Sequence, residues 1–256
     1  MVRLSFVIPA YNEAANIGRC LDSIQAELRR RPLSVEVIVV DNASTDATGD
    51  IAGRHPGVQV VRESRKGITF ARQAGFDRST GELVANIDAD TRLPVGWLDR
   101  VLAEFDRDPG LLCLSGPHRY DEAPWPVRLC TRLFYVVAFG TYLAHRFLLR
   151  SGSMVQGGNF VCRRAALARI GGFDASIQFY GEDTDIARRL HPLGRVKFTF
   201  GLPILASHRR LSGEGVFLTG LRYAVNYLWV AIFGRPFTLT SRDNRPPAHP
   251  AEPWRL

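Results

Sequence analysis

The sequence lacks the patterns that mark several common classes of protein. Its four cysteines, Cys20, Cys113, Cys130 and Cys162, are widely scattered and form no Cys-x-x-Cys pair, which argues against a zinc knuckle or a dithiol redox centre. They are therefore expected to be free thiols in a reducing compartment. No run of about 18 uncharged apolar residues occurs, so no membrane-spanning helix is expected. The apolar stretch that precedes Pro9 is too short for a secretory signal.

Two further absences concern phosphate and nucleic acid. There is no glycine-rich loop of the P-loop or dinucleotide type, so a bound phosphate would be held in another way, with a metal ion as the natural candidate. No dense basic run with interleaved aromatics occurs, which argues against a nucleic-acid partner. The formal net charge is nonetheless +8, and most of the excess is arginine. Such a balance favours anionic partners such as nucleotides or phospholipid surfaces.

Apolar periodicity predicts alternating strands and helices in the first half of the chain. The expected strands are 4–8, 35–40, 58–61 and 83–87, and the expected helices begin at residue 12 or 13, after 46 and at 70. This alternation is typical of a mostly parallel sheet with helices on both faces.

The second half of the chain is less regular. It predicts helices at 97–105, 165–170 and from 180–185 to 190, strands at 111–115, 160–162 and 196–200, and a proline-rich loop at 117–126. Two segments, 127–149 and 216–234, are strongly apolar and contain no acidic residue, and disorder is expected from 236 onward.

The first candidate site is the pair Asp88 and Asp90, which follows the apolar strand at 83–87. Open α/β sheets bind ligands at the carboxyl ends of their strands. Two carboxylates this close repel each other unless a cation or hydrogen-bond donors lie between them, and a hard divalent ion that carries a phosphorylated ligand fits. Considered alone, the pair is better explained as a turn cap at Asp88 followed by a helix start at Asp90. The other motifs of the chain therefore decide whether it is a metal site.

Polar residues also follow two neighbouring strands of the predicted sheet. They are Pro9, Ala10, Tyr11 and Glu13 after the first strand, and Asp41 and Ser44 after the second. Each group alone could be a helix-start turn or an Asx turn. These two segments and the Asp88 turn are all expected along one edge of one sheet. A site for a base and ribose therefore explains them better than three separate turns.

Three further groups have two interpretations each. Arg65, Lys66 and Arg72 could neutralise a diphosphate or lie on a solvated helix face. The acidic cluster at 182–185 could cap a helix N-terminus or supply a general base that faces the metal site. A neutral imidazole at His208 could complete the metal site, although an isolated histidine is a weak signal.

Taken in order, these motifs resemble those of the family 2 glycosyltransferases with the GT-A fold. The resemblance is carried by the segments 7–13, 39–46, 66–67, 71–72, 88–90, 171–174 and 181–183. It implies an α/β fold with a mostly parallel Rossmann-like sheet in a domain at 1–210, with a nucleotide-binding half at 1–90 and an acceptor half at 91–210. An apolar helical segment and a disordered tail are expected at 211–256.

The resemblance also implies roles for individual residues. Asp88 and Asp90 would hold Mg or Mn on the diphosphate, with His208 as a further ligand. Asp183 would be the base of an inverting sugar transfer to a hydroxyl. The donor would be a nucleotide-sugar, with a UDP-sugar favoured and GDP-mannose next. The implied donor-binding residues are Pro9, Ala10, Tyr11, Glu13, Asp41, Ser44, Lys66, Arg72, Asp88, Ala89, Asp90, Gly158, Asn159 and Glu182. Gln73 departs from the pattern, because asparagine is usual after the Ala-Arg pair.

Two other functions stay open. A nucleotidyltransferase would also use paired aspartates on an α/β sheet, but it would usually carry a glycine-rich basic loop after its first strand, where this chain has Pro9 to Glu13. A non-catalytic nucleotide-sugar-binding protein would keep the fold without a base at Asp183.

The apolar segments suggest where the acceptor comes from. Segments 127–150 and 216–235 are flanked by arginines and are too short to span a bilayer, so they could lie in its interface or pack across a homodimer. The arginines match an anionic leaflet, which favours the membrane. We therefore expect a cytoplasmic protein, peripheral on the inner face of the cell membrane, with a lipid-linked or cell-envelope acceptor.

Overall fold

The computed structural model describes residues 2–144, 154–177, 181–209, 211 and 215–238. A seven-stranded sheet forms its centre, in the order β3-β2-β1-β4-β8-β6-β9. The strands are β1 (Leu4–Ala10), β2 (Val35–Asp41), β3 (Val58–Arg62), β4 (Leu83–Ile87), β6 (Leu111–Ser115), β8 (Asn159–Arg163) and β9 (Arg195–Phe198). Only β8 among them runs against its two neighbours, so the mostly parallel sheet is confirmed.

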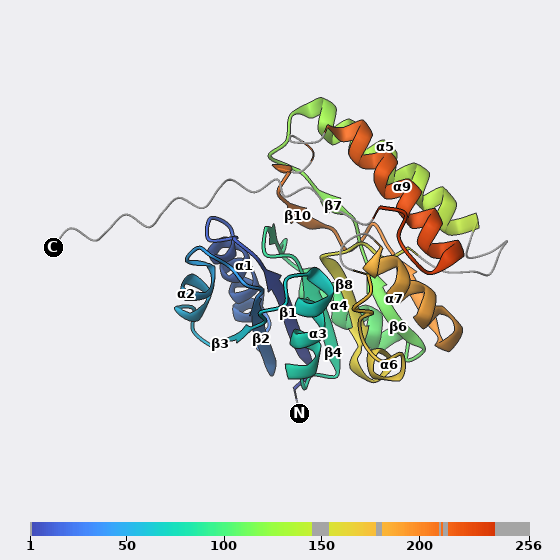
Figure 1. The fold of residues 1–256 in the computed structure, drawn as a ribbon. Coiled ribbons are helices and arrows are strands. Elements are labelled where there is room, and N and C mark those ends of the chain that lie inside the picture. The colour runs from blue at the N-terminus through green and yellow to red at the C-terminus, as the bar shows by residue number, and fades with distance from the viewer. Residues whose placement is uncertain (1, 145–153, 178–180, 210, 212–214, 239–256) are drawn as a thin grey trace.

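Helices cover both faces of this sheet, as expected (Figure 1). The helices α1 (Ile17–Arg30), α2 (Thr48–Gly53) and α4 (Trp97–Arg107) bury apolar residues against one face, together with Phe6 and Ile8. The helices α3 (Ile68–Arg78), α6 (Arg164–Arg169) and α7 (Glu182–Leu190) pack on the other, together with Val7 and Val84. A single turn of 3₁₀ helix, His191–Leu193, follows α7. The two cores explain why β1 and β4 are buried along their whole length.

A second, three-stranded sheet lies beyond the carboxyl end of β4. It contains β5 (Thr91–Arg92), β10 (Ile204–Ala206) and β7 (His118–Arg119), in that order. Through this sheet the Ser207 N–H donates a hydrogen bond to the Asp90 carbonyl oxygen, at 3.2 Å. The small sheet therefore brings late segments of the chain to the Asp88–Asp90 turn.

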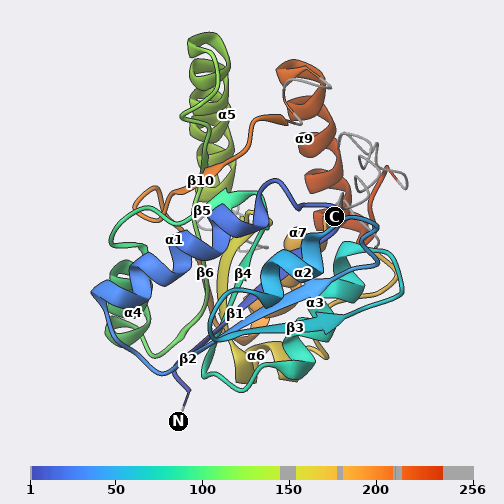
Figure 2. The same ribbon diagram turned by 90° about the vertical axis from the view of Figure 1, so that its left-hand side faces the viewer.

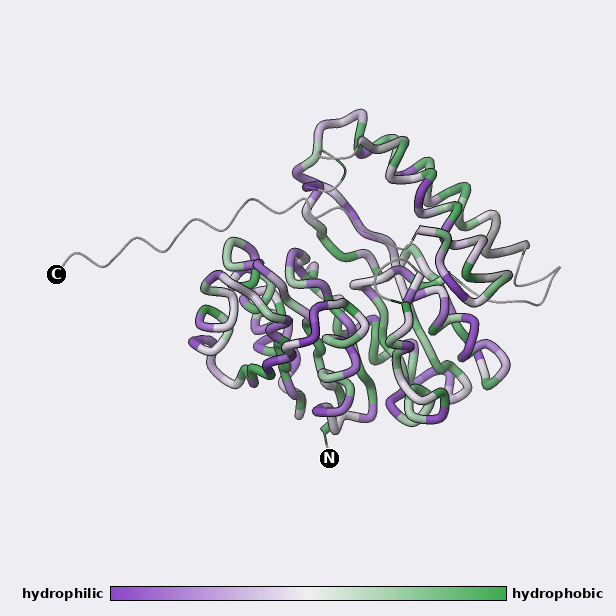
Figure 3. Tube along the Cα trace, in the orientation of Figure 1, coloured by the Kyte–Doolittle hydropathy of each residue, from purple (hydrophilic) through white to green (hydrophobic). Residues whose placement is uncertain are grey.

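Two long apolar helices, α5 (Trp125–Ala144) and α9 (Val216–Phe233), stand beyond the same end of the large sheet (Figure 2). They contact each other, and α9 also packs on α7. The apolar stretches of both helices are visible along the chain trace (Figure 3). None of the described helices is long and apolar enough to cross a bilayer.

Three sequence-based expectations about local structure are wrong. The first helix begins at Ile17, and not at residue 12 or 13. Asn12 has a left-handed φ of 50°, which does not fit a helix. The N–H groups of Asn12 and Glu13 also donate to the side chains of Ser44 and Thr48, so they form no helical turn. The loop expected at 117–126 contains β7 and the start of α5, and the strand expected at 196–200 ends at Phe198.

Other expectations can be compared only in part. All four cysteines are free thiols, as predicted. The disorder expected from 236 onward falls mostly at 239–256, which lies outside the described residues. Before that segment, Thr238 is bonded to the Asn226 side chain. The domain boundaries stay a prediction, although strands from 1–90 and from 91–210 share one sheet.

Candidate active site

The polar ends of β1 and β2 form one side of the candidate site. Ala10 pairs with Asp41 in the parallel register, so the two strands end side by side. The Asp41 carboxylate accepts a hydrogen bond from the Ser44 N–H at 3.1 Å, and the Ser44 hydroxyl in turn accepts one from the Asn12 N–H. The structure thus joins the first two predicted donor segments into one rigid double turn.

Tyr11 and Lys66 meet at the outer rim of this double turn. The Lys66 ammonium donates a hydrogen bond to the Tyr11 hydroxyl at 2.7 Å and lies 3.9 Å from the centre of the Tyr11 ring. Because Tyr11 is partly exposed and Lys66 is exposed, a ligand at this rim can meet an aromatic ring and a positive charge together.

Arg72 connects the two acidic clusters and is not on a solvated helix face. Its guanidinium contacts Asp88 Oδ1 at 3.2 Å and Glu182 Oε1 at 3.1 Å, and only 1% of the side chain is exposed. It also lies over the Phe160 ring. The end of β4 and the start of α7, far apart in sequence, are therefore held by one buried cation.

Arg209, which the sequence analysis missed, gives Asp90 a similar partner. Its Nη2 atom lies 2.6 Å from Glu13 Oε1 and 3.5 Å from Asp90 Oδ2. Each aspartate of the predicted metal pair thus faces a guanidinium. No sequence signal identifies Arg209, because β10, which places it, is only three residues long.

The donor atoms at Asp88 and Asp90 suit a hard divalent cation, which prefers carboxylate oxygens. Within the described ranges, however, no group of three or more His, Cys, Asp or Glu side chains is close enough to hold a metal ion. Such a cation would therefore take its other ligands from phosphate and water, as Mg commonly does. His208 directly follows Ser207, which is bonded to Asp90, and its role as a metal ligand stays a prediction.

Asp183 lies at the first turn of α7 with both carboxylate oxygens bonded. Oδ2 accepts from the Gly157 N–H and Oδ1 from the Thr184 N–H, each at 2.7 Å. Burial raises the pKa of Asp183, while these hydrogen bonds and the Arg72 charge act in the opposite direction. Burial and the Asp183 charge likewise raise the pKa of Glu182. A raised pKa makes a carboxylate a better proton acceptor.

The segment 156–159 lies between Asp183 and Asp88. At Gly158, where φ is +74°, a Cβ atom would collide with the Asp88 carboxylate, so only glycine fits. Asn159 is buried, and its side-chain amide bonds to the Trp97 indole N–H and the Leu202 carbonyl. Those bonds indicate a supporting role, and direct donor contacts by Gly158 and Asn159 stay predictions.

Close packing also fixes the start of α7. Gly181, with a φ of +88°, lies so near Val230 of α9 that a Cβ atom there would overlap the valine side chain. Helix α9 therefore supports the turn that carries Glu182 and Asp183.

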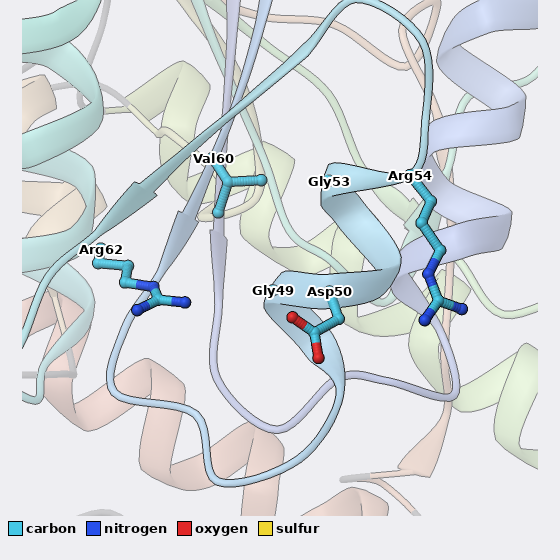
Figure 4. Close-up of a pocket in the computed structure, with 6 residues that line it drawn as sticks. All are labelled: Gly49, Asp50, Gly53, Arg54, Val60 and Arg62. Atoms are coloured by element: carbon cyan, nitrogen blue, oxygen red, sulfur yellow. The ribbon is translucent and has the colours of Figure 1, made fainter.

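A hollow of about 490 Å³ elsewhere on the molecule contains none of the predicted donor residues (Figure 4). It lies between α2 and β3, and its lining is Gly49, Asp50, Gly53, Arg54, Val60 and Arg62. The candidate site is therefore identified from its charged and hydrogen-bonded groups, and not from this hollow.

Comparison with known proteins agrees with this geometry. The family model described as "Glycosyl transferase family 2" matches residues 5–171. An uncharacterised glycosyltransferase of Mycobacterium tuberculosis is 33% identical over 176 residues, which are 67% of this chain and 72% of that protein.

Solved structures show the same fold. A mannosyltransferase of Pyrobaculum calidifontis, in complex with GDP-Man and Mn²⁺, has a TM-score of 0.70 and 25% identity, over 90% of this chain and 64% of that one. Glucosyl-3-phosphoglycerate synthase of Mycobacterium tuberculosis, in complex with Mn²⁺, UDP-glucose and phosphoglyceric acid, has a TM-score of 0.61 and 22% identity, over 92% and 81%. The fold expected from the motifs is confirmed.

Proposed function

Because the chain belongs to glycosyl transferase family 2 and is thus a glycosyltransferase, we propose that it moves a sugar from a UDP-sugar or GDP-mannose to a hydroxyl acceptor, with inversion at the anomeric carbon. The observation that carries the proposal is the bridge through Arg72. It holds Asp88, at the end of β4, next to Glu182, the neighbour of the candidate base Asp183. The site thus joins a phosphate-binding side and a proton-accepting side.

Each side of the site has its own task in this proposal. Asp88 and Asp90 would hold Mg or Mn, and the bound ion would supply positive charge beside the departing nucleoside diphosphate. The Tyr11–Lys66 pair and the Asp41 turn hold the nucleotide portion of the donor. Asp183 accepts the proton of the acceptor hydroxyl at a carboxylate oxygen, and Gly157 and Thr184 keep that carboxylate oriented.

A panel of nucleotide-sugars, each measured with Mn²⁺, tests the donor. At a concentration of about 100 times its dissociation constant, the correct donor is expected to raise the melting temperature by about 5–10 °C. With an acceptor, release of nucleoside diphosphate would support the proposal. Release of pyrophosphate would instead support a nucleotidyltransferase, and donor binding without turnover would support a non-catalytic binding protein.

We also propose that α5 and α9 place the protein on an anionic membrane surface, where it meets a lipid-linked acceptor. Five large apolar side chains on α5 are 48–68% exposed, namely Trp125, Leu129, Leu133, Val136 and Val137. Leu218, Leu221 and Phe233 of α9 are similarly exposed. Arg128 and Arg132 are exposed on α5 beside this apolar surface, and neither helix contains an acidic residue. Exposed apolar area with adjacent arginines is typical of interfacial helices.

Flotation with liposomes tests this surface. The protein is expected to float with vesicles that contain anionic lipid and to bind less to zwitterionic ones, with binding that weakens as salt rises. Leu133→Glu together with Val137→Glu should abolish flotation. Val95→Glu is the matched control, because Val95 is 76% exposed and lies in the segment between β5 and α4, outside both apolar helices. A protein that stays at the bottom of the gradient and elutes as a dimer would point to a homodimer interface instead.

A further inference from the structure

Tyr135 is a buried residue on a helix that exposes many of its apolar side chains. It lies in the middle of α5, yet only 7% of it is exposed. Its ring stacks on Phe198 of β9, with 6.3 Å between ring centres and 19° between ring planes. The ring therefore packs inward, and the phenol hydroxyl reaches the segment beside the candidate base.

The Tyr135 hydroxyl uses both of its hydrogen-bonding functions. It accepts from the His118 backbone N–H at 3.0 Å and donates to Gln156 Oε1 at 3.0 Å. The hydroxyl thus joins α5 to β7 and to the start of the 156–158 segment. Burial raises the pKa of Tyr135, so the phenol keeps the proton that it donates.

Each residue of the 156–158 segment bonds to a different part of the molecule. Gln156 bonds through its side chain to Tyr135 and through its N–H to the Ser115 hydroxyl, at 2.9 Å. Gly157 donates to the Asp183 carboxylate at 2.7 Å. The Gly158 carbonyl oxygen accepts a hydrogen bond from the Asp88 N–H. A displacement of Gln156 would therefore reach the Gly157 N–H that holds the base, while Gly158 keeps its own bond to Asp88.

We propose that Tyr135 is a positioning residue for Asp183: its hydroxyl fixes the 156–158 segment so that the Gly157 N–H holds the carboxylate in the orientation that transfer requires. This inference rests on the proposed function of Asp183 as a base. The Tyr135 hydroxyl also links α5 to the reacting groups, because α5 carries both the exposed apolar surface and Tyr135.

Tyr135→Phe removes the hydroxyl and keeps the ring that stacks on Phe198. The partly buried Gln156 side chain and the His118 N–H then lose the partner that they share, so the link between α5 and the 156–158 segment is broken. We expect kcat to fall about 10-fold, which corresponds to the loss of a hydrogen bond, while donor affinity stays unchanged. Gln156→Ala should have the same effect, and the double variant should lose little more, because both changes break one link.

The pH profile separates positioning from a loss of stability. The Gly157 hydrogen bond lowers the pKa of Asp183, so a looser bond raises that pKa and moves the acid limb of kcat/KM to higher pH. Four titratable or charged groups interact with Asp183, namely Glu182 in the same helix and Arg72, Tyr135 and Tyr227 in neighbouring elements. Tyr135→Phe replaces a neutral phenol by a neutral ring and changes none of their charges. Phe198→Leu is the control: it should lower the melting temperature but leave the acid limb in place.

Hydrogen exchange of the intact protein tests the inference without an activity assay. In Tyr135→Phe, the Gly157 amide is expected to exchange faster, while the amides of β1 and β4 keep their rates. Unchanged exchange at Gly157, or an unmoved acid limb, would overturn the positioning role. Faster exchange in a protein whose parent shows no transfer with any donor would contradict the proposed function and leave the fixing role of Tyr135 standing.

Discussion

Asp183→Asn is expected to reduce sugar transfer by roughly 10²–10⁴-fold, the usual contribution of a general base. Asparagine fills the same space, and its carbonyl oxygen can still accept from Gly157 or Thr184, but it cannot take a proton from the acceptor. Donor binding should be unchanged, because the donor-side contacts at β1, β2 and β4 do not involve Asp183. Single-turnover rates and calorimetry with a nonhydrolysable donor measure the two effects separately.

Two checks make the Asp183 result interpretable. Because the asparagine NH₂ group would face one of the two N–H donors, a modest loss of stability is expected and should be measured by thermal unfolding. Asp99→Asn, at a partly exposed aspartate of α4 that pairs with Arg31, is the matched control and should transfer sugar at the parent rate. An Asp183→Asn variant with parent turnover would show that another group accepts the proton.

The second large effect is expected at Asp90. Asp90→Ala should weaken Mn²⁺-dependent donor binding by at least about 10–100-fold, since even changes to groups around a metal ligand cost that much affinity. Titrations of donor with and without Mn²⁺, followed by calorimetry, measure this directly. Asp121→Ala, which removes an exposed carboxylate bonded to Arg119, is the control.

The unfolding temperature without metal gives an independent readout at Asp90. The Asp90–Arg209 contact is 3.5 Å long and partly exposed, and such pairs contribute about 0–1 kcal/mol. Metal-free Asp90→Ala should therefore unfold close to the parent temperature. Donor binding that is equally strong with and without Mn²⁺, and insensitive to this substitution, would contradict the proposed metal role.

The strand ends could be predicted from sequence because they depend on local patterns. The run Leu83–Ile87 is apolar apart from Asn86 and ends at Asp88, so its bounds follow from hydrophobicity. Parallel strands with polar ends then place Asp41 and Asp88 on one sheet edge. The sequence therefore predicted which strand ends share one sheet edge, and the donor-binding roles of their residues stay predictions.

The remaining contacts depend on chain segments that meet only after folding. Whether Arg72 faces water or Glu182 is decided by a residue 110 positions away. Arg209 reaches Glu13 across 196 positions, through a sheet whose strands are two or three residues long. Tyr135 lies in an apolar helix whose pattern distinguishes no inward face, so its hydroxyl gave no signal. Hydrophobic periodicity carries no information about such pairings.

The contact between Gly181 and Val230 has a consequence for the order in which the protein matures on the ribosome. Strands β1 to β4 and their polar ends are synthesised before α7 and α9, and domains generally fold as they are synthesised. The turn that carries Asp183 gains its support from Val230 only after α9 has also been synthesised. A nascent chain should thus hold nucleotide before it can transfer a sugar.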